Sequence, residues 1–354
     1  VTRSPSARPR WWLVTLGLPV LSALTPTRHA AAQQSDGRVS ASECCIHVLL
    51  PTAARAVALG QAVVADTAPD AFFYNPAGLS RLTARRVEVY HTPLPDQSQI
   101  DAISLLLRPW GVGTLGLTYE LLDFGSQERT DPQNNPTGEL FDQGHLLAAT
   151  FAAELAAGLS GGLTYKLFIE HASCGQGCDA GVSGSTAMVD VGLQFRPRRL
   201  SWLAAGASIA HAGLPLQIVN KEQADPTPVR VRAGASVQAL HFARADSMLA
   251  LWLSGQVEGS GIDARDPVLA LGAELSVGEV MRVRTGYRGG TGGGSGLALG
   301  VGFSVDRFVL DVGKVVTTTD LAPEGAFYVS LGILLDRPAR QATAAAPPKQ
   351  SRRL

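Results

Sequence analysis

The sequence predicts an all-β fold, a transmembrane antiparallel β-barrel of about 14 strands. Three observations predict it. Apolar and polar residues alternate along most of the chain after residue 84. Most alternating runs are about ten residues long, which is the length that a tilted strand needs to cross a bilayer. After the first run, short and long connections alternate, as they do in barrels whose turns lie on opposite sides of a membrane.

The N-terminus has the layout of a secretory signal peptide, predicted to cover residues 1–32. Arg3, Arg8 and Arg10 form a basic region before an apolar stretch, and "HAAAQQ" offers an Ala-x-Ala site with cleavage after Ala32. A membrane anchor is the competing interpretation, but about 14 apolar residues are too few to span a bilayer. The remaining chain is therefore expected in an oxidising compartment.

Residues 33–83 do not alternate and are predicted to form a hatch, a small N-terminal segment inside the barrel. Small apolar residues between 53 and 64 suit a short, closely packed helix, which the Asp and Pro residues at 66–70 would end. In "FFYNPAGLS", Asn75 can cap a turn and Pro76 presets the next φ angle. A barrel of about 14 strands is too wide for its own side chains to fill, so an insert has space there.

The barrel is predicted to span residues 84–335. In "PVRVRAGASVQ", Val231 lies between Arg230 and Arg232, so one strand face is apolar and the other polar. In "TYKLFIE" the alternation holds except at Phe168, an apolar residue on the polar face. The predicted strands are 84–92, 97–108, 111–122, 143–156, 158–171, 182–196, 200–211, 228–240, 247–258, 267–278, 280–289, 296–305, 307–318 and 325–335.

One predicted strand has an alternative. Residues 146–162 are rich in Ala and Leu, which favour helices, so they could form an amphipathic helix. We interpret them as a strand that runs into a turn, because they lead directly into the clear alternation of 163–170.

Short and long connections alternate along the chain. The short set is 108–111, 156–159, 196–200, 242–246, 277–280 and 305–307. The long set includes 123–143, 172–181, 213–228, 259–266 and 317–325. Short periplasmic turns and longer outer loops are typical of outer-membrane barrels, so we expect the chain in the outer membrane of a Gram-negative-type bacterium.

In such a barrel the apolar face points to lipid and the polar face points to an enclosed lumen. A closed barrel also lets every backbone N–H and C=O be paired within the hydrocarbon region. The charged residues expected to line the lumen are Arg230, Arg232, Arg282, Arg284, Glu274, Asp190 and Asp311. They could serve as solvated, mutually paired lining or as a dedicated ligand-binding set.

The four cysteines are consistent with an oxidising compartment. Cys174 and Cys178 can close a small glycine-containing loop as a disulfide, and a metal site is the competing interpretation. Cys44 and Cys45 are adjacent and could stay reduced or form a bond with each other.

Composition argues against several function classes. The 354 residues carry no net charge, so no basic face marks a nucleic-acid partner. No Gly-x-Ser-x-Gly, His-Glu-x-x-His or phosphate-binding loop occurs, and "GGTGGGSG" lacks the Lys that such a loop requires. We therefore expect no enzymatic activity, no cofactor and no metal site.

The segment "LLPTAARAVALGQAVVADTAPDAFFYNPAGLSRL" (49–82) resembles the N-terminal signature of the FadL-like outer-membrane proteins, most of all their PorV/PorQ branch. The matching residues are Ala54, Arg55, Ala56, Gly60, Ala62, Ala65, Asp66, Ala68, Asp70, Ala71, Asn75, Pro76, Ala77, Gly78 and Leu79. "VRVRAGASV", "MRVRTGYRGG" and "AFYVSLGILL" also look like strands of that branch, so the resemblance covers about residues 47–335. It implies a fourteen-stranded barrel with a hatch in its lumen.

Two features depart from the family pattern. Thr52 and Ala53 stand where the family often has Val-Gly. The chain also continues past its last predicted strand into residues 336–354, an Ala-, Pro- and Arg-rich tail that we expect to be disordered. Many outer-membrane proteins instead end on an aromatic residue.

Two functions follow from the resemblance. The first is passive transport of hydrophobic small molecules, which predicts an apolar pocket beside the hatch and a gap or kink in the wall. The second is a PorV-like shuttle or scaffold for protein secretion of the type IX kind. The expected partners are outer-membrane lipid, the barrel-assembly machinery, and either a hydrophobic ligand or the signal domain of a secreted protein. A soluble extracellular β-protein is a third, weaker interpretation.

Overall fold

The computed structural model describes residues 43–94, 97–175, 181–218, 224–244, 247–261, 267–290, 295–317 and 326–336. The predicted signal peptide, residues 33–42, Cys178 and the predicted tail after Asp336 lie outside the described residues. No helix in the described ranges has the length and apolar character to cross a membrane.

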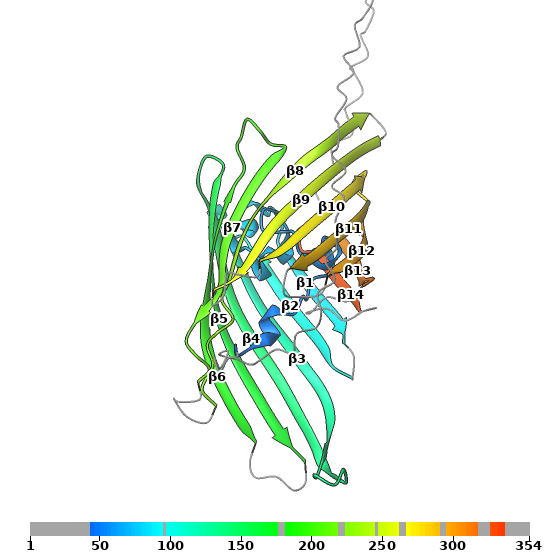
Figure 1. Cartoon of the computed structure of the whole chain (residues 1–354). Helices are drawn as coiled ribbons and strands as arrows, with labels where there is room; N and C mark the ends of the chain where they lie inside the picture. Colours follow the sequence, from blue (N-terminus) through cyan, green and yellow to red (C-terminus); the bar gives the residue numbers. More distant parts are fainter. Residues whose placement is uncertain are drawn as a thin grey trace, which may run out of the picture. The chain divides into compact units, whose positions relative to one another are not determined.

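Fourteen antiparallel strands form one closed barrel in sequence order, with β1 paired to β14 (Figure 1). Their bounds are β1 Arg86–Pro93, β2 Gln99–Leu107, β3 Thr114–Thr130, β4 Pro136–Ala156, β5 Leu159–Cys174, β6 Val182–Phe195, β7 Leu203–Gly213, β8 Arg230–Arg244, β9 Ser247–Ser260, β10 Val268–Val277, β11 Met281–Gly290, β12 Gly296–Val305, β13 Phe308–Val315 and β14 Phe327–Leu334. A predicted strand lies at each of these places. Residues 146–156, for which a helix was the alternative, belong to β4.

The prediction of a loop over residues 123–143 is wrong for most of that range. β3 continues to Thr130 and β4 begins at Pro136, and Gln127 pairs with Leu140 in the extended hairpin. A β-bulge beside Gly125, whose φ is 69°, interrupts the register. Polar residues occupy both faces of this hairpin, so the two-residue pattern that reveals the other strands is missing here.

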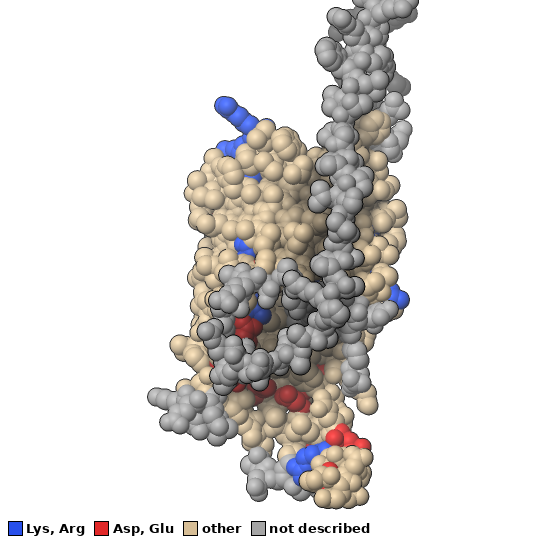
Figure 2. Space-filling model, viewed as in Figure 1, with Lys and Arg blue, Asp and Glu red and all other residues tan. Residues whose placement is uncertain are grey.

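The barrel has the burial pattern of a protein in lipid. Val231 is 47% exposed, whereas its neighbour Arg232 is 5% exposed and points inward. Large apolar side chains are exposed on nearly every strand, among them Phe151, Leu193 and Leu253. On the face shown in Figure 2, charged side chains are few over the upper wall and gather toward the lower end. A closed barrel with an apolar outer surface satisfies the requirements for spanning a bilayer.

Residues 43–82, hereafter the inner segment, lie inside the barrel (Figure 1). The segment forms four short helices: η1 Ile46–Leu49, α1 Ala54–Ala58, η2 Pro69–Phe73 and η3 Pro76–Arg81. α1 packs against β11 to β14, and η3 packs against β3 to β6. A further short helix, η4 Pro109–Gly111, lies in the turn between β2 and β3. The hydrophobic core therefore lies between the inner segment and the inner face of the barrel wall. In one part of it, Phe72 and Leu79 of the segment pack against Tyr90 and Leu106 of the wall.

Glycines on the inner wall allow this close packing. A Cβ atom added to Gly286 on β11 would collide with the backbone of Gly60, and one on Gly206 would collide with the carbonyl of Val64. The wall glycines that meet the backbone of the inner segment in this way are Gly162, Gly206, Gly272, Gly286 and Gly313, and Gly192 and Gly300 meet its side chains at Asn75 and Ala58. Because only glycine lets two backbones approach so closely, this glycine ring seats the inner segment.

We expect Leu253→Arg to lower the free energy of unfolding in lipid vesicles by about 2–4 kcal/mol, because it puts a charge on the lipid face near the middle of β9. Denaturant titration followed by tryptophan fluorescence would measure the change. Leu253→Phe, which keeps the site apolar, is the control. Equal stability of the two variants would contradict the outward orientation.

We expect Gly286→Val to lower the stability by about 1–3 kcal/mol through overpacking and to expose the inner segment to protease. Gly255→Val is the matched control, because a Cβ there would meet only Leu271 at 3.7 Å. Limited proteolysis of the refolded barrels compares the two. Full protection of the inner segment in Gly286→Val would show that the wall does not need glycine at this position.

Candidate functional site

Arg55 joins three parts of the bore. Its guanidinium lies 2.5 Å from Asp66 and 3.3 Å from Asp70, both within the inner segment, and 4.0 Å from Glu274 on β10. Burial raises the pKa of the Asp66 carboxyl above its ordinary value, against the opposing effect of Arg55. The arginine therefore holds the loop before η2 against α1 and links both to the wall.

The Asn-Pro-Ala-Gly stretch forms the turn that leads into η3. The side chain of Asn75 accepts a hydrogen bond from the Ala77 N–H at 3.1 Å, which is the predicted cap. Its amide also donates to the carbonyls of Val64 at 2.6 Å and Leu193 at 3.0 Å. Gly78 lies so close to Asp66 that any side chain would collide with the Asp66 carbonyl. This turn thus connects the inner segment to itself and to β6.

Side chains of the wall also bond to the backbone of the inner segment. Gln194 donates to the carbonyl of Ala65 at 2.7 Å, Gln256 accepts from the N–H of Val64 at 3.0 Å, and Ser330 accepts from the N–H of Ala54 at 3.0 Å. These bonds satisfy backbone groups that no regular secondary structure pairs.

The charges predicted to line the lumen all point inward and have polar partners. Arg284 binds Glu274 at 2.6 Å and Asp311 at 2.5 Å. The other pairs are Arg232–Glu258 at 2.5 Å, Arg288–Glu258 at 2.7 Å, Lys166–Asp190 at 2.6 Å, Arg230–Glu43 at 2.7 Å and Arg282–Ser304 at 2.7 Å. The geometry is that of mutual pairing, one of the two roles expected for these residues.

Two cavities beside the inner segment are lined mainly by polar residues, whereas a third, of about 20 Å³ between Val57 and Leu297, is mostly apolar. The larger, of 250 Å³, is lined by charged residues that include Arg55, Asp70, Glu88 and Arg284. A second, of 180 Å³, shares Arg55 and Glu274 with it. The expectation of an apolar pocket beside the hatch is not met at these two cavities, and the apolar one has room for about one water molecule. The barrel wall is closed by hydrogen-bonded strands all the way round. A β-bulge at His211 interrupts the register between β6 and β7.

An apolar patch interrupts the polar lining nearer the long loops. It consists of Leu146 on β4, Phe168 on β5, Met188 on β6 and Leu216 after β7, all at most 5% exposed. Cys44, Cys45 and Val48 at the start of the inner segment cover it. Phe168 is the residue that breaks the alternation in the sequence, so one member of this patch had a sequence signal. Met188 and Leu216 had none.

Cys44 and Cys45 form a disulfide with each other, which decides between the two possibilities that the sequence left open. Cys45 has a positive φ of 55°. The predicted pairing of Cys174 includes Cys178, which lies outside the described residues.

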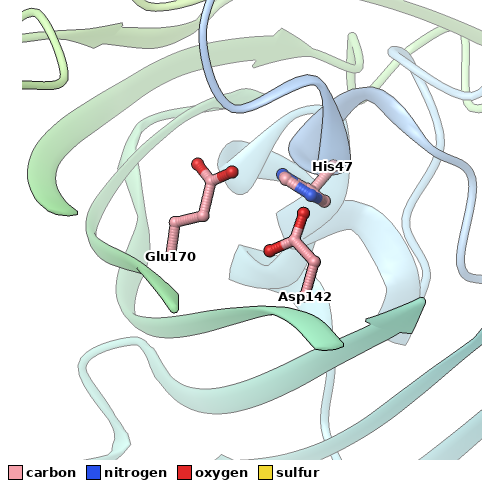
Figure 3. A group of neighbouring side chains, drawn as sticks. All are labelled: His47, Asp142 and Glu170. Atoms are coloured by element: carbon pink, nitrogen blue, oxygen red, sulfur yellow. The ribbon is translucent and has the colours of Figure 1, made fainter. Parts of the chain in front are cut away.

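His47 lies beside the apolar patch and faces two carboxylates (Figure 3). Its ring stacks on Phe168 at 5.3 Å and contacts Phe124 edge-on at 5.2 Å between ring centroids. Burial lowers the pKa of His47 to about 4, so the imidazole is neutral at neutral pH. Among the described residues, neither ring nitrogen of His47 has a hydrogen-bond partner. Each buried polar atom without a partner lowers the stability by about 1–3 kcal/mol.

Sequence reasoning missed His47, Asp142 and Glu170, which it did not place in any site. They come from three elements far apart in the chain, and no spacing motif connects them.

We expect Glu258→Gln to lower the free energy of unfolding by about 3 kcal/mol, because Arg232 and Arg288 would remain buried without their shared carboxylate. Glu154→Gln is the control. It breaks an exposed ion pair with Arg198, which contributes under about 1 kcal/mol. Denaturant midpoints in vesicles would measure both, and a Glu258→Gln protein as stable as the control would contradict the pairing described for the bore.

No protein-family model matches the chain, and none of the curated proteins matches it. Solved structures share its fold. The toluene transporter TbuX of Ralstonia pickettii has a TM-score of 0.53 at 12% identity and covers 81% of this chain and 99% of its own. The CymD monoaromatic hydrocarbon channel has a TM-score of 0.51 at 11% identity, covering 82% and 98%. A FadL homologue of Pseudomonas aeruginosa has a TM-score of 0.51 at 10% identity, covering 81% and 99%.

This likeness shows a shared fold, a fourteen-stranded FadL-like barrel. The PorV/PorQ branch is not among these structures. The closed barrel and its apolar outer surface make the chain an outer-membrane barrel.

Proposed function

We propose that this barrel is a passive outer-membrane channel for apolar small molecules. The observation that carries the proposal is the apolar patch of Leu146, Phe168, Met188 and Leu216. Inward positions elsewhere in the described barrel are mostly polar, charged, glycine or alanine, and larger apolar ones such as Tyr90 and Leu106 pack against Phe72 and Leu79 of the inner segment. An apolar surface inside a polar bore suits a ligand that is itself apolar, because burying both surfaces releases water. The fold shared with a toluene transporter and a monoaromatic hydrocarbon channel supports the same ligand class.

The start of the inner segment occupies the place where such a ligand would bind. Cys44, Cys45 and Val48 cover the patch as an apolar ligand would. Uptake therefore requires residues 43–50 to leave the patch. Beyond it, the bore is filled by the rest of the inner segment and lined by ion pairs, so onward passage requires that segment to shift as well. The ligand moves down its own concentration gradient.

The alternative, a shuttle or scaffold for a secreted protein, predicts a lumen that stays sealed and outer loops that dock protein. The β3–β4 hairpin is long enough to project from the barrel, but it carries no feature that selects this role. The uptake experiment below distinguishes the two functions.

Cells that lack their own hydrocarbon channel and produce this protein should take up radiolabelled toluene faster than cells with an empty vector, and arabinose at an equal rate. Met188→Glu places a charge in the apolar patch and should reduce toluene uptake by about tenfold, since burying an unpaired charge is strongly unfavourable. The control is the exposed Glu154→Gln.

Surface abundance and heat-modifiable migration of each variant report whether the barrel is assembled. Toluene uptake equal to the empty vector with an assembled wild-type barrel would overturn the proposal. Recovery of a stable secreted partner from the same cells would then favour the scaffold.

A further inference from the structure

The cluster of His47, Asp142 and Glu170 combines groups that ordinarily have partners. His47 is 7% exposed, and both of its ring nitrogens lack a hydrogen-bond partner within the described part of the chain. The Oδ1 atom of Asp142 is likewise buried without a partner. Buried polar atoms are nearly always hydrogen-bonded, so each of these unpaired groups requires an explanation.

The three side chains converge from three elements. His47 is on η1, Asp142 on β4 and Glu170 on β5, and Figure 3 shows the imidazole directed at the two carboxylates. One ligand atom from each residue lies within 4.8 Å of the others. Gly144 pairs with Glu170 and has no side chain, which leaves room for the ring of His47, 3.4 Å from where a Cβ would be.

The charges at the cluster are unbalanced. Two carboxylates face one imidazole, and among the described residues no Lys or Arg forms an ion pair with Asp142 or Glu170. The ion pairs elsewhere in the bore show that this lumen otherwise compensates its carboxylates. A bound cation would supply the missing positive charge and would give the imidazole a partner.

We propose that His47, Asp142 and Glu170 bind one divalent transition-metal cation, for which Zn²⁺ is best suited. Zinc accepts one imidazole nitrogen together with carboxylate oxygens, whereas Ca²⁺ and Mg²⁺ prefer sites made only of oxygen. Bonds of about 2.0–2.2 Å would place tetrahedral ligand atoms about 3.4 Å apart, so atoms that now lie within 4.8 Å of one another would approach by up to about 1.4 Å. Water would complete the coordination.

Such a cation would fasten the inner segment to the wall. His47 lies between Cys45 and Val48, the residues that cover the apolar patch, and its ring stacks on Phe168 of that patch. Binding the cation would therefore hold residues 43–50 over the patch. This step rests on the proposed function. A ligand that stabilises the closed arrangement shifts the population of barrels toward that arrangement, so the cation would inhibit uptake.

The first test measures binding alone. The full chain, purified in detergent without a polyhistidine tag and stripped with EDTA, is titrated with ZnCl₂ by calorimetry, and retained zinc is counted after desalting. The wild type should retain one zinc more than His47→Phe, which keeps an aromatic ring between Phe124 and Phe168. Glu170→Gln should weaken binding by about tenfold or more.

His145→Phe is the matched control, because His145 lies three residues from Asp142 but is only half-buried and bonds to Tyr119 instead. It should bind zinc as the wild type does. The proposal is overturned if the wild type retains no more zinc than His47→Phe, or if His145→Phe lowers binding as much as His47→Phe does.

The second test separates the cation from the channel. Micromolar ZnCl₂ should slow toluene uptake in cells with the wild type and leave cells with His47→Phe unaffected. Zinc binding in a barrel that transports no toluene would confirm the metal site and overturn the proposed function. Zinc binding with unchanged toluene uptake would overturn the fastening role.

Discussion

The pairing of β1 with β14 is the constraint on which the rest of the structure depends. Hydrocarbon offers no hydrogen-bond partner, so the sheet must close on itself before its edges can enter a membrane. Closure inverts the usual arrangement of residues: apolar side chains cover the outside and charged ones are enclosed. The enclosed charges must then be satisfied within the bore. Ion pairs such as Arg284 with Glu274, and bonds to the inner segment, meet that requirement.

The inner segment is as much a part of the core as the strands are. Small residues on α1 and glycines on the wall bring two backbones together, and wall amides such as Gln194 pair with carbonyls that would otherwise be unmet. Apolar contacts also join the segment to the wall, among them the cluster of Phe72 and Leu79 with Tyr90 and Leu106 and the apolar patch. At the apolar patch, the segment and the wall meet through Cys44, Val48 and Phe168, and the hydrophobic effect stabilises this contact.

The sequence predicted those features that repeat along the chain. A period of two residues indicated the strands and the face that each residue occupies, because both follow from local geometry. The β3–β4 hairpin escaped notice because polar residues on both faces hide the period. Contacts across the bore, such as Arg55 with Glu274 or Gly286 with Gly60, follow no local rule and needed the structure. The meeting of His47 with Asp142 and Glu170 belongs to the same class.

The glycine ring also bears on the order of assembly. Seven wall glycines fit closely around the inner segment, so a finished barrel leaves that segment no wide passage by which to enter sideways. The segment precedes every strand in the chain, whereas the seam of β1 and β14 needs the last strand to be present. The curvature of the sheet and the seating of the segment are therefore coupled, because the wall that closes at this seam is the same wall that fits around the segment.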